Sequence, residues 1–234
     1  MQYANPYIER CLEGESSVFR KLNPEAKELI NGHHSVILYK KGAQVVKGKG
    51  AKTRGLIYLV SGSLKIFRIG VGGRKQTIKL VRESGLTGLS NLVTGISHTF
   101  SIAALEDSVV CFLEKGTLLK IMKNDSDLTF RLLKAVSEEN LFLSNRIISL
   151  TQKHIRGRIA ESLLLIKDNF GIEADGKTLK ASFSRDDIAN LSNMTTSNAI
   201  RTLSDLSAES IIEMNGKRIM ILDQSKLEKI SESG

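Results

Sequence analysis

The chain has 234 residues, of which 41% are hydrophobic and 25% are charged, so we expect one or two ordinary globular domains. It has no run of about 18 apolar residues, and its first residues lack the basic start and apolar core of a secretory signal, so we expect a cytoplasmic protein without membrane spans. The two cysteines, Cys11 and Cys111, are widely spaced. This suits a reducing compartment and excludes a C-x-x-C zinc site and a four-cysteine iron–sulphur cluster.

The net charge of +9 comes from the first half of the chain. Residues 1–125 carry 19 Lys and Arg against 10 Asp and Glu, whereas residues 126–234 carry 15 of each kind. The excess concentrates in residues 40–82, which hold twelve Lys and Arg and no Asp or Glu. Such a segment either forms a solvated strand surface or attracts an anion, such as a nucleotide, haem propionates or the flanks of bent DNA.

Short strands are predicted over most of residues 35–113. Before them, residues 6–22 are expected to be helical or partly so, and Asn23-Pro24-Glu25 is a predicted helix start. The runs SVILY, AQVV, LIYLV, LKIFRI, QTIKLV, TFSIAAL and SVVCFL alternate or are rich in β-branched residues, and glycines separate them. Ser61-Gly62 and Gly72-Gly73 are predicted hairpin tips, and a short helix is expected within residues 84–95. This pattern favours a small antiparallel sandwich or roll.

A long helix is predicted over residues 126–150, after a short one over residues 115–122. Its inner residues recur at alternating spacings of four and three, which is the heptad seam of a parallel two-stranded coiled coil. The a positions are Leu133, Asn140 and Ile147, and the d positions are Thr129, Val136, Leu143 and Leu150. Asn140 would fix the register of such a dimer. The alternative is a helix that packs only on its own domain.

Two short helices joined by a tight turn are predicted over residues 184–206, SRDDIANLSNMTTSNAIRTLSDL. Ser184 can cap the first helix, with Asp187 completing a weak capping box, and Thr195 can cap the second. Asn193 suits the turn because Asn tolerates a left-handed backbone. The second helix is expected to turn Ala199, Ile200, Leu203 and Leu206 inward, and Thr196, Ser197, Asn198 and Arg201 outward. Such outer residues suit the major groove, although the pattern alone also fits a packing motif.

The surroundings of this motif favour DNA binding. A helix is expected over residues 155–169, a short strand over residues 179–183 and a last short helix over residues 225–230. The segment IIEMNGKRIMIL predicts a β-hairpin turned at Asn215-Gly216, which would form a wing. Basic side chains that could meet phosphates occur at Lys153, Arg156, Arg158, Arg185, Lys217 and Arg218.

The order of these parts resembles the Crp/Fnr family of bacterial transcription regulators over nearly the whole chain. YKKGAQVV is similar to the family's first roll segment, IYLVSGSLKIFR to its central hairpin, and FSRDDIANLSNMTTSNAIRTLSDL to its helix-turn-helix. The resemblance implies an α+β fold with a cupin-like antiparallel β-roll over residues 1–124, a dimerisation helix and hinge over residues 125–152, and a winged helix-turn-helix over residues 153–234. It also implies a homodimer on a palindromic DNA operator, with RNA polymerase as a partner.

The resemblance also assigns DNA-binding residues. The family's base-reading positions fall on Thr196, Ser197 and Arg201, where Arg201 agrees with the family arginine and Ser197 replaces a common glutamate. Residues expected to hold phosphates are Ser184, Arg185, Asn198, Lys217 and Arg218.

The matching effector positions depart from those of cyclic-AMP-binding members. Such members carry a Gly-Glu pair and an Arg-Ser or Arg-Thr pair, whereas this chain has Gly88-Leu89 and His98-Thr99. Leu89 cannot accept a ribose hydrogen bond and His98 lacks the arginine fork, so ordinary cyclic-AMP binding is not expected. The cysteine count excludes the iron–sulphur branch. A haem is conceivable, with iron ligated by His33, His34, His98 or His154, but such histidines are more typical of surfaces, so we assign no metal ligand. A member without any ligand is the remaining alternative.

Our first hypothesis is a homodimeric, sequence-specific regulator in which a signal in the roll re-aims the recognition helices through a hinge at residues 150–153. The second is a small-molecule or haem sensor that acts mainly through protein–protein contacts. A gel shift with the promoter of its own gene would distinguish them. An enzyme is not expected, because the chain shows no nucleophile triad, no phosphate-binding loop and no paired carboxylates in a plausible pocket.

Overall fold

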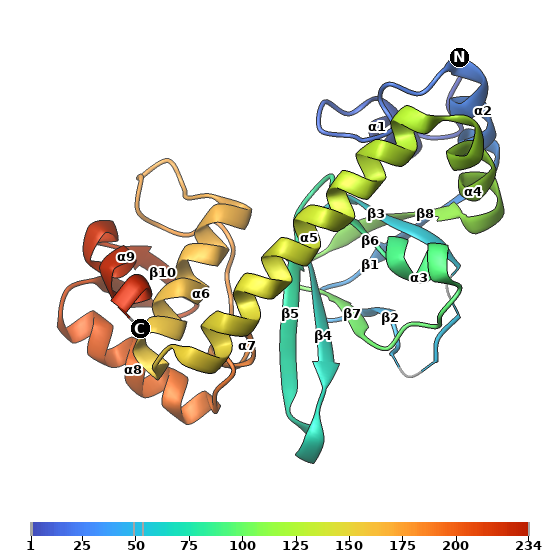
Figure 1. The fold of residues 1–234 in the computed structure, drawn as a ribbon. Helices are drawn as coiled ribbons and strands as arrows, with labels where there is room; N and C mark the ends of the chain where they lie inside the picture. The colour runs from blue at the N-terminus through green and yellow to red at the C-terminus, as the bar shows by residue number, and fades with distance from the viewer. Residues whose placement is uncertain (1, 49, 53, 234) are drawn as a thin grey trace. The chain divides into compact units, whose positions relative to one another are not determined.

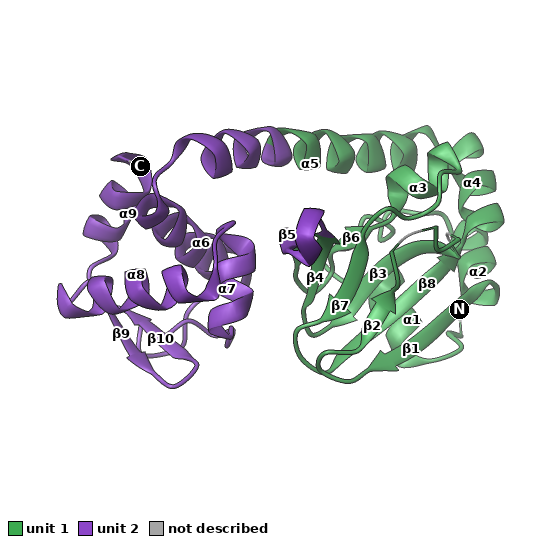
Figure 2. Cartoon of the chain, turned by 90° about the horizontal axis from the view of Figure 1, so that it is seen from below, with its two compact units in different colours: residues 1–68, 79–141 green, residues 69–78, 142–234 purple. Residues whose placement is uncertain are grey.

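The computed structural model describes residues 2–48, 50–52 and 54–233. It divides into two compact units, as Figure 2 shows: residues 1–68 with 79–141, and residues 69–78 with 142–234. The division crosses the long helix α5 (Ser126–Gln152), so each unit is described by itself.

Two helices begin the first unit, and each starts at an Asn-Pro pair. The side chain of Asn5 accepts hydrogen bonds from two backbone N–H groups of α1 (Pro6–Glu13), and Asn23 accepts one at the start of α2 (Pro24–Gly32). Proline at the first helical position loses no hydrogen bond, since its missing N–H would have no partner there. The predicted helix start at Asn23 is confirmed, whereas the preceding helical region ends at Glu13.

In the part of the chain that the structure describes, eight strands form two four-stranded sheets with antiparallel pairing, as between β1 and β8 and between β4 and β7, which confirms the predicted roll (Figure 1). The strands are β1 (His34–Tyr39), β2 (Gln44–Val46), β3 (Gly55–Ser61), β4 (Leu64–Ile69), β5 (Lys75–Val81), β6 (Leu86–Thr87), β7 (Ser101–Ala104) and β8 (Ser108–Glu114). One sheet has the order β1-β8-β3-β6 and the other the order β2-β7-β4-β5.

The two predicted glycine turns have different roles. The turn at Val71–Gly73 joins the neighbouring strands β4 and β5, which confirms the hairpin expected at Gly72-Gly73. The turn at Gly62 instead links β3 to β4, and these strands lie in different sheets. Gly62 has a φ of 89°, and a Cβ atom there would lie 2.6 Å from the Asp107 carbonyl oxygen. Only glycine therefore fits this passage between the sheets.

Strand β3 is buried on both faces and separates two hydrophobic clusters. Leu56, Tyr58 and Val60 belong to a cluster that includes residues of α1, α2 and α5, whereas Ile57 and Leu59 belong to a cluster built from both sheets. The period of two that places successive side chains on opposite faces explains this division. The short helices α3 (Leu89–Thr94) and α4 (Lys115–Asn124) complete the first unit.

Helix α5 packs one side of its first half on the first unit. Leu128 and Leu132 are buried in the cluster around Tyr58, and Val136 is partly buried against the same cluster. Within the described ranges, no helix combines the length and apolarity needed to cross a bilayer.

The second unit has a core made by the helices that follow α5. These helices are α6 (Ile155–Phe170), α7 (Arg185–Leu191), α8 (Thr196–Ala208) and α9 (Gln224–Ser233), and they are joined by the hairpin β9 (Ile212–Asn215) and β10 (Arg218–Ile221). The buried residues Leu163, Leu191, Leu203 and Leu227 come one from each helix. The helix-turn-helix with a β-hairpin wing is thus confirmed.

The strand predicted over residues 179–183 is wrong. This region makes only two isolated bridges, in which Leu179 pairs with Ile172 and Thr178 pairs with Met220. The wing turn also differs by one residue, since Gly216 and Lys217 form it. Gly216 supplies the positive φ of 59° that a tight hairpin requires.

Candidate nucleic-acid interface

Local capping interactions build the helix-turn-helix. The Ser184 hydroxyl accepts a hydrogen bond from the Asp187 N–H, and the Asp187 carboxylate accepts one from the Ser184 N–H, which confirms the capping box. Asn193 has the left-handed φ of 51° that was expected at the turn. The Thr195 hydroxyl then caps α8 by accepting the Asn198 N–H at 3.3 Å.

Helix α8 buries a face that differs by one position from the predicted one. Ala199, Leu203 and Leu206 are buried as expected, but Ile200 is 48% exposed and Thr202 is buried in its place. Thr202 follows Ala199 by three residues, so the two side chains lie on the same face of the helix. Ile200 directly follows Ala199 and is therefore turned away from that face. Ile200 therefore shares the outer face with Ser197, and the sequence pattern did not identify it as a surface residue.

The three predicted base-reading residues differ in their freedom to contact a base. Ser197 and Arg201 are exposed, and Arg201 donates a long hydrogen bond of 3.4 Å to the Asn198 side chain. The Thr196 hydroxyl donates instead to the Asp186 carboxylate at 3.1 Å. The geometry therefore leaves Ser197 and Arg201 better placed than Thr196 to reach a base edge.

The predicted phosphate-binding residues also separate into two groups. Lys217 and Arg218 are exposed at the wing. Arg185 donates to the Gly216 carbonyl at 2.9 Å and so holds the wing turn against α7. Ser184 has no donor left for a phosphate, because the capping box uses both its N–H and its hydroxyl. Of the expected group, Lys217 and Arg218 are the residues best placed to meet phosphates.

The basic patch expected around the start of α6 is largely neutralised. Arg156 forms two hydrogen bonds with the Glu209 carboxylate, of 2.5 and 2.6 Å, and Lys153 pairs with Glu161 at 2.9 Å. Glu209 lies 53 residues from Arg156, and Glu161 lies eight residues from Lys153, so charge counting along the sequence did not pair them. The positive charge of this surface is therefore smaller than the sequence indicated.

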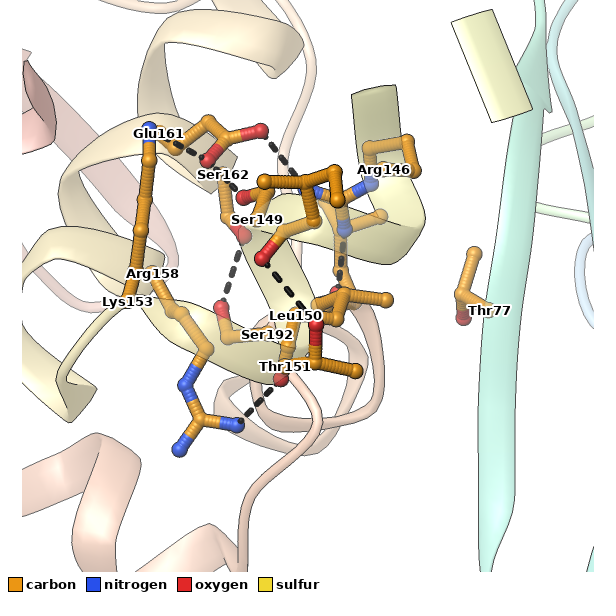
Figure 3. A network of polar contacts seen from close by, with 12 residues as sticks. Thr77, Arg146, Ser149, Leu150, Thr151, Lys153, Arg158, Glu161, Ser162 and Ser192 are labelled. Atoms are coloured by element: carbon orange, nitrogen blue, oxygen red, sulfur yellow. Dashed lines mark hydrogen bonds and ion pairs between the residues drawn. The ribbon is translucent and has the colours of Figure 1, made fainter. Parts of the chain in front are cut away.

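Two arginines hold the turn of the helix-turn-helix, as Figure 3 shows. Arg146 of α5, only 5% exposed, donates to the Glu161 carboxylate at 3.1 Å and to the Leu191 carbonyl at 2.7 Å. Arg158 of α6 donates to the Asn193 carbonyl at 3.0 Å. We call Arg146, Arg158 and Glu161 the turn clamp. Through it, the last part of α5 fixes the position from which α8 starts.

The Glu161 carboxylate is the centre of this clamp. It accepts hydrogen bonds from Arg146, Lys153 and the Ser149 hydroxyl. Burial alone would raise its pKa, but the hydrogen bonds from Ser149 and Lys153 and the charges of Arg146 and Lys153 outweigh burial, so the pKa of Glu161 is lowered from its usual 4.5. The ionised form is therefore the one that the folded state stabilises.

The pKa of Glu161 predicts a pH-dependent stability. A group with a lowered pKa in the folded state contributes stability that is present above its unfolded pKa and lost as the pH falls through its folded value. The difference in urea midpoint between the unsubstituted protein and Glu161→Gln should therefore be largest near neutral pH and shrink below about 4.5. A difference that stays constant between pH 7 and pH 3.5 would contradict the role of this carboxylate.

An apolar stripe runs along the other side of α5. Phe130, Leu133, Leu141, Ile147 and Ile148 are each more than half exposed. The predicted a positions at 133, 140 and 147 lie on this exposed side. The predicted d positions at 136, 143 and 150 are half-buried within the chain. The exposed apolar face therefore contains the predicted a positions but is rotated about the helix axis, by about one residue, away from the d positions.

The expected effector residues do not converge on one site. Leu89 is 8% exposed and packs in the cluster around Tyr58, and Thr99 is exposed. His98 is buried, with its ring edge-on to Phe100, and lies beside Gly88, whose added Cβ would be 3.6 Å from the ring. None of the four expected effector residues carries a carboxylate or a guanidinium.

The four histidines are dispersed. His33 and His34 each place Nδ1 at 2.9 Å from a backbone carbonyl of α2, and His154 is exposed at the start of α6. Burial lowers the pKa of His98, so its ring is neutral near pH 7. No group of three or more metal-binding side chains is found among the residues that the structure describes.

Comparisons with known proteins agree with this architecture. A family model described as a cyclic nucleotide-binding domain matches residues 36–125, and one described as a Crp-like helix-turn-helix domain matches residues 157–230. The chain is 26% identical to the global nitrogen regulator of Nostoc sp. over 70% of its own length and 75% of that protein. It is also 26% identical to electron transport regulator A of Shewanella oneidensis, over 80% and 74% of the two chains. The solved structure of FixK2 from Bradyrhizobium japonicum shares the fold, with a TM-score of 0.75 at 21% identity over 84% of this chain and 96% of that one.

Proposed function

Since the chain belongs to the Crp/Fnr family of DNA-binding transcription regulators, which are not enzymes, we propose that it reads a palindromic operator as a homodimer under the control of an effector other than ordinary cyclic AMP. The observation that carries the proposal is the outer face of α8. There Ser197, Ile200 and Arg201 are exposed on a helix that is capped at its start and followed by a wing.

Each of these side chains suits a different base feature. The Arg201 guanidinium can donate two hydrogen bonds to O6 and N7 of a guanine, and Ser197 can donate to or accept from a base edge. Ile200 can contact the methyl group of a thymine. Lys217 and Arg218 would hold the phosphates beside the groove, which positions the helix without reading sequence.

The apolar stripe of α5 supports the homodimer. An exposed row of large aliphatic and aromatic side chains on a helix is a self-association surface in a family that binds DNA as a dimer. Pairing of two chains would present two α8 helices to half-sites one DNA turn apart.

Charge on this stripe should therefore dissociate the dimer. The double variant Leu133→Glu with Ile147→Glu is expected to be monomeric at concentrations where the unsubstituted protein is dimeric, because each buried side chain contributes roughly 1.5–3 kcal/mol. Sedimentation velocity measures the change. Asn145→Glu is the control, since it adds charge to an exposed position of α5 outside the stripe. A double variant that remains dimeric would show that the chains associate through another surface.

Selection of binding sites from random duplex DNA by the full-length protein tests the proposal. We expect an enriched palindrome with half-sites about 10 base pairs apart and a preference over random DNA of roughly a thousandfold or more. Addition of cyclic AMP should leave this affinity unchanged, because Leu89 and His98 replace the ribose and phosphate partners. Binding that is weak, salt-dependent and indifferent to sequence would overturn the proposal.

A further inference from the structure

A pocket of about 340 Å³ opens in the first unit, on the side of the roll where β1 and β2 lie. Its walls include Tyr39 of β1, Val46 of β2, Ile57 of β3 and Phe112 of β8. His98 also lines it, whereas the other three residues matched to the family's nucleotide site, Gly88, Leu89 and Thr99, do not. The pocket therefore shares His98 with the site that the family resemblance indicated, but its other lining residues lie outside the matched positions.

The inner wall of the pocket is apolar and uncharged. Ile57 and Phe112 are buried members of the cluster built from both sheets, and Val46 belongs to the same cluster. His98 is 2% exposed, and its Nδ1 atom has no hydrogen-bond partner in the described part of the chain. Burial also raises the pKa of Tyr39, against the opposing effect of Arg54, so its hydroxyl stays protonated. A buried ring nitrogen without a hydrogen-bond partner lowers the stability of the folded state. A bound polar group could remove this cost if the His98 ring turned so that the nitrogen met it.

The outer wall of the pocket is cationic. Lys47, Lys52 and Arg54 line it, and all three are exposed. Among the described residues, no ion pair is found for any of the three, and residues 40–82 contain no acid. Glu114 borders the adjoining smaller pocket with Arg54, but its carboxylate accepts a hydrogen bond from the Thr117 hydroxyl. Within residues 2–48, 50–52 and 54–233, the positive charge at this entrance thus has no ion-pair partner.

We propose that this pocket binds a small organic anion, with a carboxylate or phosphate held by Lys47, Lys52 and Arg54 and an apolar body packed on Ile57 and Phe112. An apolar chamber with a few convergent polar groups is the usual form of a small-molecule site, and its volume lies at the lower end of the range for such sites. That this anion is the signal that controls DNA binding rests on the proposed function, whereas binding of the anion in the pocket is independent of that function.

Calorimetric titration of the full-length protein with four probes tests the inference. The probes are 4-phenylbutyrate and phenyl phosphate, which combine an anion with an apolar body, benzyl alcohol, which lacks the charge, and inorganic phosphate, which lacks the apolar body. At least one of the first two should bind saturably and roughly tenfold more tightly than either of the others. The better of the two identifies the anionic group. Equal binding of all four probes, or no binding of either organic anion at millimolar concentration, would overturn the proposal.

Variants locate the bound probe. The double variant Lys52→Gln with Arg54→Gln should weaken the preferred probe roughly tenfold, whereas Arg68→Gln, which removes an exposed charge of β4 outside the pocket, should not. Methyl resonances of Ile57 should shift on titration with the unsubstituted protein. An unshifted Ile57, or equal weakening in both variants, would place binding elsewhere and refute the site. DNA affinity is measured separately: if the probe binds here without changing it, the site stands and only its role in control fails.

Discussion

Replacement of Arg201 with alanine is expected to weaken binding to the selected operator by about 1–3 kcal/mol, or roughly 5- to 150-fold, while binding to random DNA changes little. The guanidinium is exposed on the outer face of α8, where it donates a long hydrogen bond of 3.4 Å to Asn198. It is thus available for a bidentate contact to guanine, which alanine cannot make. Fluorescence anisotropy with the operator and with a scrambled duplex, at the same salt concentration, measures both affinities.

Lys217→Ala provides the matched control for this prediction. Lys217 is an exposed cation at the wing turn, where a phosphate rather than a base is expected. Its loss should weaken operator and scrambled duplex alike and reduce the slope of log affinity against log salt by about one. Equal losses on both duplexes for Arg201→Ala would mean that Arg201 also binds phosphate and that α8 reads sequence through other residues.

The helix-turn-helix could be predicted from sequence because local interactions specify it. The capping residues Ser184 and Thr195 contact N–H groups three positions further on, and Asn193 is a residue type that tolerates the left-handed φ of the turn. Such signals lie within a few residues of the element they define, so they can be recognised without knowledge of the fold. The strands of the roll and the hairpin at Gly72-Gly73 were predicted for the same reason.

The features that the sequence did not predict depend on partners from elsewhere in the chain. Arg156 was expected to meet phosphate, but the fold brings it to Glu209. The resemblance matches Leu89 to an acid of the cyclic-AMP site, and the sequence could not show that its side chain belongs to the hydrophobic core. Ile200 satisfied an apolar pattern although its position turns outward, because Thr202 takes the inner place. In each case tertiary packing decides the role, not residue type.

Replacement of Arg146 with alanine is expected to remove the contacts by which α5 takes part in the turn clamp. Arg146 is almost fully buried and joins α5 to two separate places, the Glu161 carboxylate on α6 and the Leu191 carbonyl at the end of α7. Removing one partner from a buried, hydrogen-bonded pair leaves the other partner without compensation and costs several kcal/mol. Glu161 would keep its contacts with Lys153 and Ser149. We therefore expect Arg146→Ala to lower the free energy of unfolding by about 2–3 kcal/mol.

Hydrogen exchange of the peptides that cover residues 185–200 measures this effect where it should occur. In Arg146→Ala these amides should exchange faster, and operator affinity should fall because α8 no longer starts from a fixed turn. Lys134→Ala is the matched control, since Lys134 also lies on α5 and pairs with Glu138 at 3.8 Å, but with both side chains exposed. Lys134→Ala should lower the free energy of unfolding by less than about 1 kcal/mol and should leave hydrogen exchange at residues 185–200 unchanged. If Arg146→Ala and Lys134→Ala behaved alike, the contacts of Arg146 with Glu161 and Leu191 would not hold the turn from which α8 starts.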